Sequence, residues 1–282
     1  MRFTAMLSFL RSAIGSWARC RTLSVSHGVL AAVFLLAGCS GGVYPDPNDV
    51  AEAGPKTPVV IQNQLRSAAD QLNDRKAKGE LGNRRYAALM AKIARDYIAQ
   101  AKDQTITKEN ASLWGDVYVS ARDWEHAEPA LETAVQAEKV PASEDYITLG
   151  WYITDTLRLA RVKAELGKVQ DAIRIVRTTF VHPAKAKAPI LPAVLYEIVP
   201  AGQGKGHDLE LADLLKESVA QHESVLIDPN TDAGRNFLLA RPHHIERAWA
   251  QAALLYGSAG RPDLAQDALN HARQTAGSTT RL

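Results

Sequence analysis

The feature that most constrains the fold is the three- and four-residue spacing of apolar side chains, which continues from residue 58 almost to the C-terminus. Ile61, Leu65, Ala68, Ala69 and Leu72 follow this spacing, and a second stretch repeats it between residues 86 and 101. Apolar residues at this spacing form one buried stripe along an α-helix. Alternation of apolar and polar residues, the pattern of a half-buried strand, never lasts beyond about four residues. The sequence therefore predicts an all-α fold.

Helix boundaries are marked by local signals. Thr57-Pro58 is typical of an N-cap followed by proline at the first helical position. Gly79 and Gly82 are expected to end the helix that follows, and Asn110 is expected to cap a third helix. A fourth helix is predicted from about Trp124.

Residues 181–242 interrupt this regular pattern. The segment 181–192 is rich in proline, alanine and lysine, which excludes a long helix, and the glycine-rich stretch 200–206 is expected to be a flexible loop. A helix follows, with Leu209, Leu215 and Val219 on one stripe, and residues 228–231 have the composition of a turn. We interpret 181–242 as an irregular insertion in a helical domain that spans 58–282.

The N-terminal segment has the pattern of a signal peptide. Residues 28–38 form an uninterrupted run of 11 apolar or small residues, preceded by arginines at positions 2, 11, 19 and 21. A membrane-spanning helix needs about 20 such residues, so this run is too short to span a bilayer and matches the core of a secretion signal. An ordinary secretory signal, or a short buried helix, each with a cysteine at position 39 by chance, is the alternative interpretation.

The run ends in Leu36-Ala37-Gly38-Cys39, which resembles the lipobox of bacterial lipoproteins. The resemblance implies that residues 1–38 are removed and that Cys39 carries a diacylglyceryl group, with a further acyl chain on its amine. Two or more acyl chains anchor a protein stably in a bilayer. Because Ser40 rather than Asp follows the cysteine, the resemblance favours the periplasmic leaflet of the outer membrane, with the inner membrane as the alternative.

The next residues, 39–57, contain Gly41-Gly42, Pro45, Pro47 and Gly54-Pro55 and no helical period. A flexible segment of this length spans about 25 Å on average. It is expected to be a tether between the lipid and the helical domain, and a loop packed against that domain is the alternative.

Charge and cysteine content exclude several kinds of function. Residues 39–282 carry 29 basic and 31 acidic side chains, so they lack the basic excess that nucleic-acid binding requires. Residues 40–282 contain no cysteine, which excludes a disulfide framework, a thiolate zinc site and a cysteine nucleophile from that part.

The helix pairs resemble tetratricopeptide repeats, which place small residues where two antiparallel helices cross. The clearest unit has Trp114-Gly115, Tyr118, Trp124 and Ala127, and three weaker units place an alanine at positions 87, 172 and 265. The resemblance implies stacked antiparallel helix pairs in a tetratricopeptide-like solenoid. The alanines are separated by 40, 45 and 93 residues rather than a regular period of about 34. An irregular helical bundle therefore remains an alternative.

Motifs for catalysis or cofactor binding are missing. The adjacent His243 and His244 project about 100° apart on a helix and so cannot easily share a metal, and His182 and His207 lie elsewhere. The stretch 202–206 lacks the Gly-Lys-Ser/Thr ending of a phosphate-binding loop. Glu125, Glu128 and Glu132 are interpreted as a solvated helix face rather than an acidic binding patch. We expect no enzyme activity, cofactor or metal.

The sequence thus favours a membrane-anchored, periplasm-facing scaffold that binds one or more envelope proteins and no nucleic acid. The resemblance to anchored repeat proteins implies work in barrel assembly, secretin or pilus assembly, or peptidoglycan synthesis. Its groove is expected to contain Tyr118, Trp151, Tyr152 and Arg158, which lie on candidate first helices of the pairs. Alternatives are a small-molecule-binding lipoprotein that serves a transporter, and an enzyme whose pocket gathers His182, His207 or His243 with a carboxylate.

Overall fold

The computed structural model describes residues 56–101, 104–137, 146–181 and 190–279. All regular elements among them are helices, which confirms the all-α prediction for the described part of the chain. By its internal contacts the chain divides into two units, 1–55 and 56–282. The signal segment, Cys39 and the tether up to Pro55 lie outside the described residues. None of the described helices combines the length and apolarity required to cross a bilayer.

The first hairpin consists of α2 (Pro58–Ala77) and α3 (Asn83–Ile98). The Thr57 hydroxyl accepts a hydrogen bond from the Val60 amide at 3.4 Å, so Thr57 caps α2 as the sequence predicts. Gly79 adopts φ +76° directly after the helix. This left-handed conformation favours glycine and ends α2.

The second hairpin consists of α4 (Ala111–Ala121) and α5 (Trp124–Ala137). Asn110 occupies the N-cap position of α4, but its side chain makes no capping bond. It instead accepts a hydrogen bond from the Thr107 amide at 2.8 Å and donates one to the Thr105 carbonyl at 3.0 Å. The predicted position is correct, while the side chain stabilises the preceding loop.

The third hairpin consists of α6 (Tyr146–Glu165) and α7 (Val169–Val181). The segment expected to be an irregular insertion then contains α8 (Leu191–Ala193), the π-helix η3 (Val194–Ile198), α9 (Val199–Gly202) and α10 (Asp208–Ser224). Pro200–Gly202, expected in a flexible loop, are the end of α9. Lys205 holds the loop that follows, because its Nζ donates to the Ala164 and Glu165 carbonyls of α6 at 2.7 and 2.9 Å.

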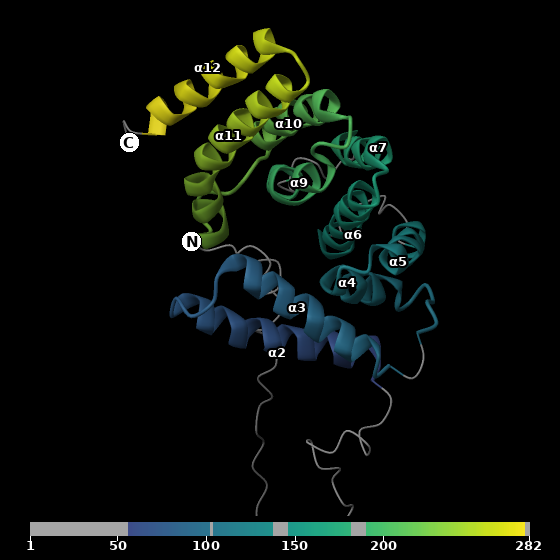
Figure 1. Ribbon diagram of the computed structural model, residues 1–282. Coiled ribbons are helices and arrows are strands. Elements are labelled where there is room, and N and C mark those ends of the chain that lie inside the picture. Colours follow the sequence, from purple (N-terminus) through teal and green to yellow (C-terminus); the bar gives the residue numbers. More distant parts are fainter. Residues whose placement is uncertain (1–55, 102–103, 138–145, 182–189, 280–282) are drawn as a thin grey trace, which may run out of the picture. The chain divides into compact units, whose positions relative to one another are not determined.

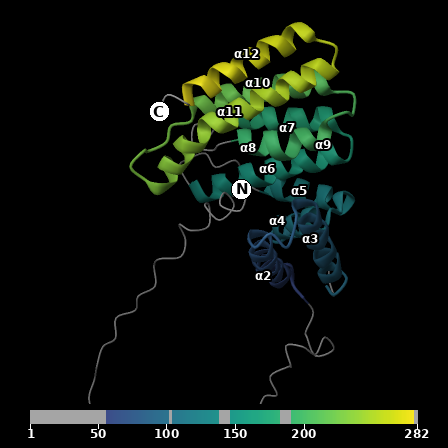
Figure 2. The ribbon, with the colours of Figure 1, turned by 60° about the vertical axis from the view of Figure 1, so that its left-hand side comes forward.

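The last hairpin consists of α11 (Asp232–Ser258) and α12 (Pro262–Thr279), which lie side by side in both views (Figures 1 and 2). Thr231 caps α11 by accepting from the Gly234 amide at 2.9 Å. The helix then continues through Pro242. α11 therefore begins within the segment expected to be the insertion, 181–242. Pro242 has no backbone N–H to donate, but the helix is not broken there.

The turn after α2 has Gly79 in the left-handed region, and the Glu80 amide donates to the Arg75 carbonyl at 3.0 Å. The three later hairpins share this turn geometry and add an alanine at a fixed offset. In each, a residue in the left-handed region ends the first helix: Arg122, Gly167 and Gly260. The next amide donates five residues back, from Asp123 to Tyr118, from Lys168 to Lys163 and from Arg261 to Tyr256, at 2.8–2.9 Å. This is the hydrogen bond of a Schellman motif. Five residues after the left-handed residue, the chain places an alanine in every case: Ala127, Ala172 and Ala265.

A small residue also stands seven positions before each of these turns. These residues are Gly115, Ala160 and Ala253, and all three are buried. The close approach is clearest at Gly115, where a Cβ atom would lie 2.5 Å from Cδ2 of Leu131 on α5. Small residues at this position allow the two helices of a pair to pack closely.

The buried apolar residues form two clusters. One joins α2–α6 around Trp114, Val117 and Leu131, and the other joins α6–α12 around Leu191, Leu215 and Leu255. Ile175 on α7 packs against both clusters. Helices that follow one another in the chain pack against each other, and Figure 1 shows them as neighbours.

Candidate functional site: a polar seam along alternate helices

Polar side chains link the first helices of successive pairs. We call the set the polar seam: Gln62 on α2, Asp116 on α4, Asp155, Arg158 and Arg161 on α6, and Glu197 on η3. At its centre the Arg158 guanidinium donates to Asp155 at 3.1 Å and forms an ion pair with Asp116 at 2.9 Å. Gln62 Nε2 donates to the other oxygen of Asp116 at 2.7 Å. Arg158 therefore connects α6 to α4, and Asp116 extends the connection to α2.

The centre of the seam is largely removed from water. The Asp155 side chain is 0% exposed, that of Arg158 is 15% exposed and that of Asp116 is 22% exposed. Burial raises the pKa of Asp155, and the opposing effects of Arg158 and of a hydrogen bond from Ser112 do not cancel it. The pKa of Arg158 is raised although burial alone would lower it, because Asp116 and Asp155 favour its charged form.

The seam becomes more accessible toward η3. Arg161 forms an ion pair with Glu197 at 3.1 Å, with 27% and 46% of the two side chains exposed. The Arg161 guanidinium also lies 5.4 Å from the ring centroid of Trp124 on α5. This end combines a partly exposed cation, a carboxylate and an aromatic ring, which are groups that bind charged peptide segments. The seam has the chemistry of a binding surface, and its side chains include no hydroxyl or thiol nucleophile.

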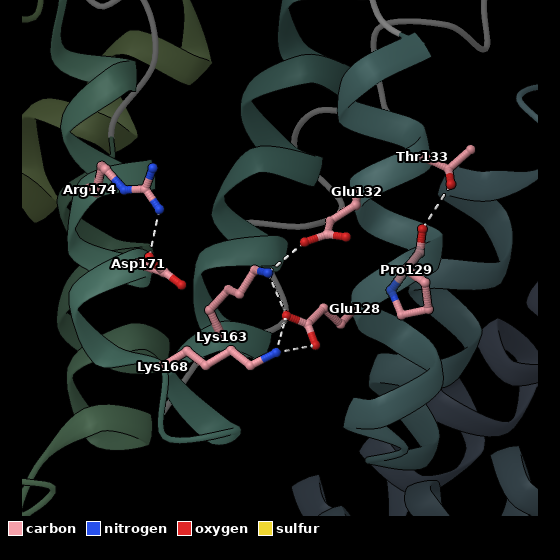
Figure 3. A network of polar contacts seen from close by, with 8 residues as sticks. All are labelled: Glu128, Pro129, Glu132, Thr133, Lys163, Lys168, Asp171 and Arg174. Carbon is pink, nitrogen blue, oxygen red and sulfur yellow. Dashed lines mark hydrogen bonds and ion pairs between the residues drawn. The ribbon is translucent and has the colours of Figure 1, made fainter.

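A second polar network joins α5 of one hairpin to α6 and to the α6–α7 turn of the next (Figure 3). Lys163 donates to Glu128 and, at 2.5 Å, to Glu132, while Lys168 donates to both oxygens of Glu128 at 2.7 and 2.8 Å. Burial would raise the pKa of Glu128, but the two lysines outweigh it and hold the pKa below its ordinary value. Of the three glutamates expected to be solvated, Glu128 and Glu132 are thus partners of lysines on α6 and in the turn before α7.

The sequence-predicted site residues have different environments. Cys39 lies outside the described residues, and of Trp151 only the helical backbone of α6 is described. Tyr152 is half-buried on α6, and Arg158 is the centre of the seam. Tyr118 is 2% exposed: its ring stacks on Trp114 at 5.4 Å and its hydroxyl donates to Gln104. In this structure Tyr118 is therefore a core residue of α4.

The sequence interpretation did not identify Asp116 and Asp155. A signal for Asp155 exists, because it stands three residues before Arg158 in a stretch of α6 that is otherwise mostly apolar. An i, i+3 pair of opposite charge on such a stripe indicates a buried ion pair. Gln62 and Glu197 have no comparable local signal, since their partners are on other helices.

The described histidines lie in separate environments. Among the described residues, no three histidine or acidic side chains lie close enough together to hold a metal. His207 faces Glu210 at 3.5 Å, and His243 is exposed. An open hollow of about 360 Å³ lies beside α10–α12, lined by Glu223, Arg241, Pro242, Ile245, Gln274 and Thr275. His182 lies outside the described residues.

His222 on α10 is the most unusual of the histidines. It is 0% exposed, packs on Phe237 with ring centroids 4.9 Å apart, and lies 5.9 Å from the His244 ring. Neither of its ring nitrogens has a hydrogen-bond partner among the described residues. Burial, together with the neighbouring His244 and Arg241, lowers its pKa to about 3, so the ring is neutral at pH 7.

Comparison with known proteins gives no relative: no family model, no curated protein and no solved structure matches this chain.

Proposed function

We propose that this protein is a lipid-anchored scaffold of the cell envelope, in which a tetratricopeptide-like array of helix pairs binds a segment of a partner protein without catalysis. The observation that carries the proposal is the turn shared by three hairpins. Arg122, Gly167 and Gly260 all adopt the left-handed conformation. Each is followed by an amide that donates a hydrogen bond five residues back and, five residues further on, by an alanine. A recurrence of this kind is the mark of a repeat unit.

The positions of the small residues support the same proposal. In tetratricopeptide-like repeats small residues occupy the crossing of the two helices. Here Ala127 and Ala172 on the second helices are 0% exposed, as is Ala160 on a first helix. Gly115 approaches Leu131 so closely that a methyl group does not fit without movement. The hairpin of α2 and α3 has a longer turn, since Ala87 stands eight residues after Gly79 rather than five.

The binding surface follows from this arrangement. Stacked helix pairs leave an extended groove along their first helices, and such grooves bind extended or helical segments. In this chain the polar seam runs along the first helices α2, α4 and α6 to η3. Its accessible end is the pair of Arg161 and Glu197, and the Trp124 ring of the second helix α5 lies beside Arg161. We assign the partner's binding site to that end, beside Tyr152 and Arg158 of the same helix. A partner segment with a carboxylate would pair with Arg161 in exchange for Glu197.

The membrane anchor is the second part of the proposal and depends on Cys39. The apolar run 28–38, the preceding arginines and the lipobox-like Leu36-Ala37-Gly38-Cys39 support it. An anchored array concentrates its partner at one membrane face, which is the advantage of a scaffold in an envelope assembly. The outer membrane, facing the periplasm, is the proposed location.

The test is site-specific photo-crosslinking in intact envelopes. A photoreactive residue at position 161 is expected to give one discrete crosslinked protein. The same residue at position 174, an exposed arginine on the second helix α7, is the matched control and is expected to give none. Crosslinking should fall in a Cys39→Ser variant, which is not anchored. Equal crosslinking from positions 161 and 174, or none from either, would contradict the proposed groove.

A further inference from the structure

The hairpin of α2 and α3 has a charge unlike the rest of the helical domain. Residues 56–101 contain nine basic and four acidic side chains, a net charge of +5, whereas residues 104–282 contain 19 basic and 23 acidic side chains, a net charge of −4. The helical domain thus has one strongly basic part. That part follows directly on the segment that begins at Cys39.

The basic residues concentrate at the turn between the two helices. Five of them fall within residues 75–85, and we call this set the basic tip: Arg75, Lys76, Lys78, Arg84 and Arg85. All five are exposed. Within residues 75–85 the one acidic residue is Glu80, which lies 3.6 Å from Arg75. It offsets only part of the positive charge of the tip. Lys76 Nζ lies 5.6 Å from the centroid of the Tyr86 ring, so the lysine stem covers the ring while the ammonium charge stays at the surface.

The basic tip is the free end of its hairpin. The polar contacts that join the hairpin to α4 come from its other half, where Gln62 binds Asp116 and Arg95 donates to the Ala121 carbonyl. Between the two helices of the tip, Leu72 and Leu81 are buried, with 7% and 3% of their surfaces exposed. The turn of the hairpin accordingly lies at its end away from α4 (Figure 1). The tip is a folded and exposed surface.

Helix stability accounts for only part of this cluster. Arg75 and Lys76 stand in the last turn of α2, where positive charge is favourable for the helix dipole. Arg84 and Arg85 stand in the first turn of α3, where positive charge is unfavourable, and that turn contains no acidic residue. Two arginines at a helix N-terminus weaken the helix, so their presence indicates attraction to something outside the chain.

We propose that the basic tip binds the anionic phospholipid headgroups of the bilayer that holds Cys39. The inference rests on the proposed function, because the lipid anchor brings the tip and the membrane together. Sixteen residues lie between Cys39 and Lys56, and a flexible chain of that length would span about 22 Å on average and about 50 Å when extended. The extended length exceeds the roughly 30 Å length of the 20-residue α2 that separates Lys56 from the tip, so the tip can reach the headgroups. An exposed cluster of lysines and arginines suits a charged surface, and each such residue strengthens binding to an anionic membrane by roughly fivefold. The tip thereby fixes which side of the scaffold faces the lipid.

The test measures binding of the purified full chain to vesicles, with Cys39→Ser in every protein so that acyl chains make no contribution. One set of vesicles contains phosphatidylcholine with about 30 mol% phosphatidylglycerol, which resembles an anionic leaflet. Binding to these vesicles is compared with binding to vesicles of pure phosphatidylcholine. The tip variant is Lys78→Glu, Arg84→Glu and Arg85→Glu. The control variant, Lys216→Glu, Arg247→Glu and Arg273→Glu, changes the net charge equally at exposed positions elsewhere. All the proteins share residues 1–55, so any binding by that part is common to them.

The tip variant is expected to lose the preference for anionic vesicles, with a partition coefficient roughly a hundredfold lower than that of the parent, while the control variant keeps it. Circular dichroism is expected to show equal helix content, because all six side chains are exposed. Equal vesicle binding by the two variants overturns the proposal. Binding that persists in about 0.5 M salt also overturns it, because that salt concentration screens charges beyond ~4 Å. Stronger binding of the parent to polyglutamate than to the vesicles would assign the tip to an acidic protein instead. A failure here leaves the anchor at Cys39 testable on its own by mass spectrometry.

Discussion

Replacing Arg158 by methionine tests the polar seam directly. Methionine keeps much of the side-chain volume but removes the guanidinium that pairs with both Asp155 and Asp116. Asp155 is then a fully buried carboxylate without its counter-charge. Removing one partner of a buried ion pair costs about 3–5 kcal/mol. Because Arg158 is 15% exposed and Asp116 is 22% exposed, we expect the lower end, about 3 kcal/mol of the free energy of unfolding.

The assay is urea unfolding followed by far-ultraviolet circular dichroism. With a denaturant dependence of about 2–3 kcal/mol per molar urea, the expected loss lowers the unfolding midpoint by roughly 1 M. The double variant Arg158→Met, Asp155→Asn is expected to recover part of that loss, since it removes the unpaired charge. The control is Arg174→Met, which removes an exposed ion pair with Asp171 and is expected to leave the midpoint unchanged.

The pH dependence of the Arg158→Met variant gives a second readout. The folded-state pKa of Asp155 is already raised, and loss of Arg158 raises it further. The folded state then binds a proton more readily than the unfolded state, so the deficit is largest at pH 7 and shrinks as the pH falls through the folded-state pKa. A variant that unfolds at the wild-type midpoint, or whose deficit grows toward acid pH, would refute the assigned role of Arg158.

Two further predictions concern the hairpin crossing and the buried histidine. Gly115→Ala is expected to destabilise the fold by about 1 kcal/mol, because the strain of moving buried Leu131 exceeds the gain in helix propensity. At Gly257 the added methyl group meets no atom within 4 Å, so Gly257→Ala is expected to stabilise the fold by about 0.5–1 kcal/mol. Thermal melts check both, and shifts of the same sign would mean that the crossing at Gly115 is not tight. His222→Leu is expected to flatten the loss of stability in acid: the folded-state pKa of about 3 lies below the ordinary 6.5, so His222 costs stability progressively as the pH falls from about 6.5 to 3. Unchanged steepness of the melting temperature against pH in that variant would be inconsistent with a neutral buried His222.

The sequence predicts the helical elements well where the signals are local. Thr57 caps α2, Gly79 ends it, and α5 begins at Trp124 as expected. Of the four alanines expected at helix crossings, Ala127 and Ala172 are fully buried, whereas Ala87 and Ala265 are half-buried. These features depend on a few adjacent residues and on the helical period, which are visible in one dimension.

The departures occur where distant partners or weak local signals decide. The segment 181–242 has breakers that indicate an irregular insertion. The helix expected there around Leu209, Leu215 and Val219 is confirmed as α10, but α8, η3, α9 and the first part of α11 are further helices that the breakers do not indicate. Residues of α8, η3 and α9 are buried in the core, whereas residues 232–240 of α11 are mostly exposed. α11 continues through Pro242, although a proline is a local signal for the end of a helix. The seam depends on Gln62, Asp116 and Glu197, whose partners are on other helices, so pattern analysis of one helix does not find it.

The proposed scaffold depends on an acylated Cys39 that ties the helical domain to a membrane. Intact mass spectrometry of the protein purified from its own membranes tests this anchor. We expect a chain that lacks residues 1–38 and begins at Cys39 with diacylglyceryl and acyl groups attached. A mature N-terminus at any other residue, or Cys39 recovered as an unmodified thiol, would contradict it.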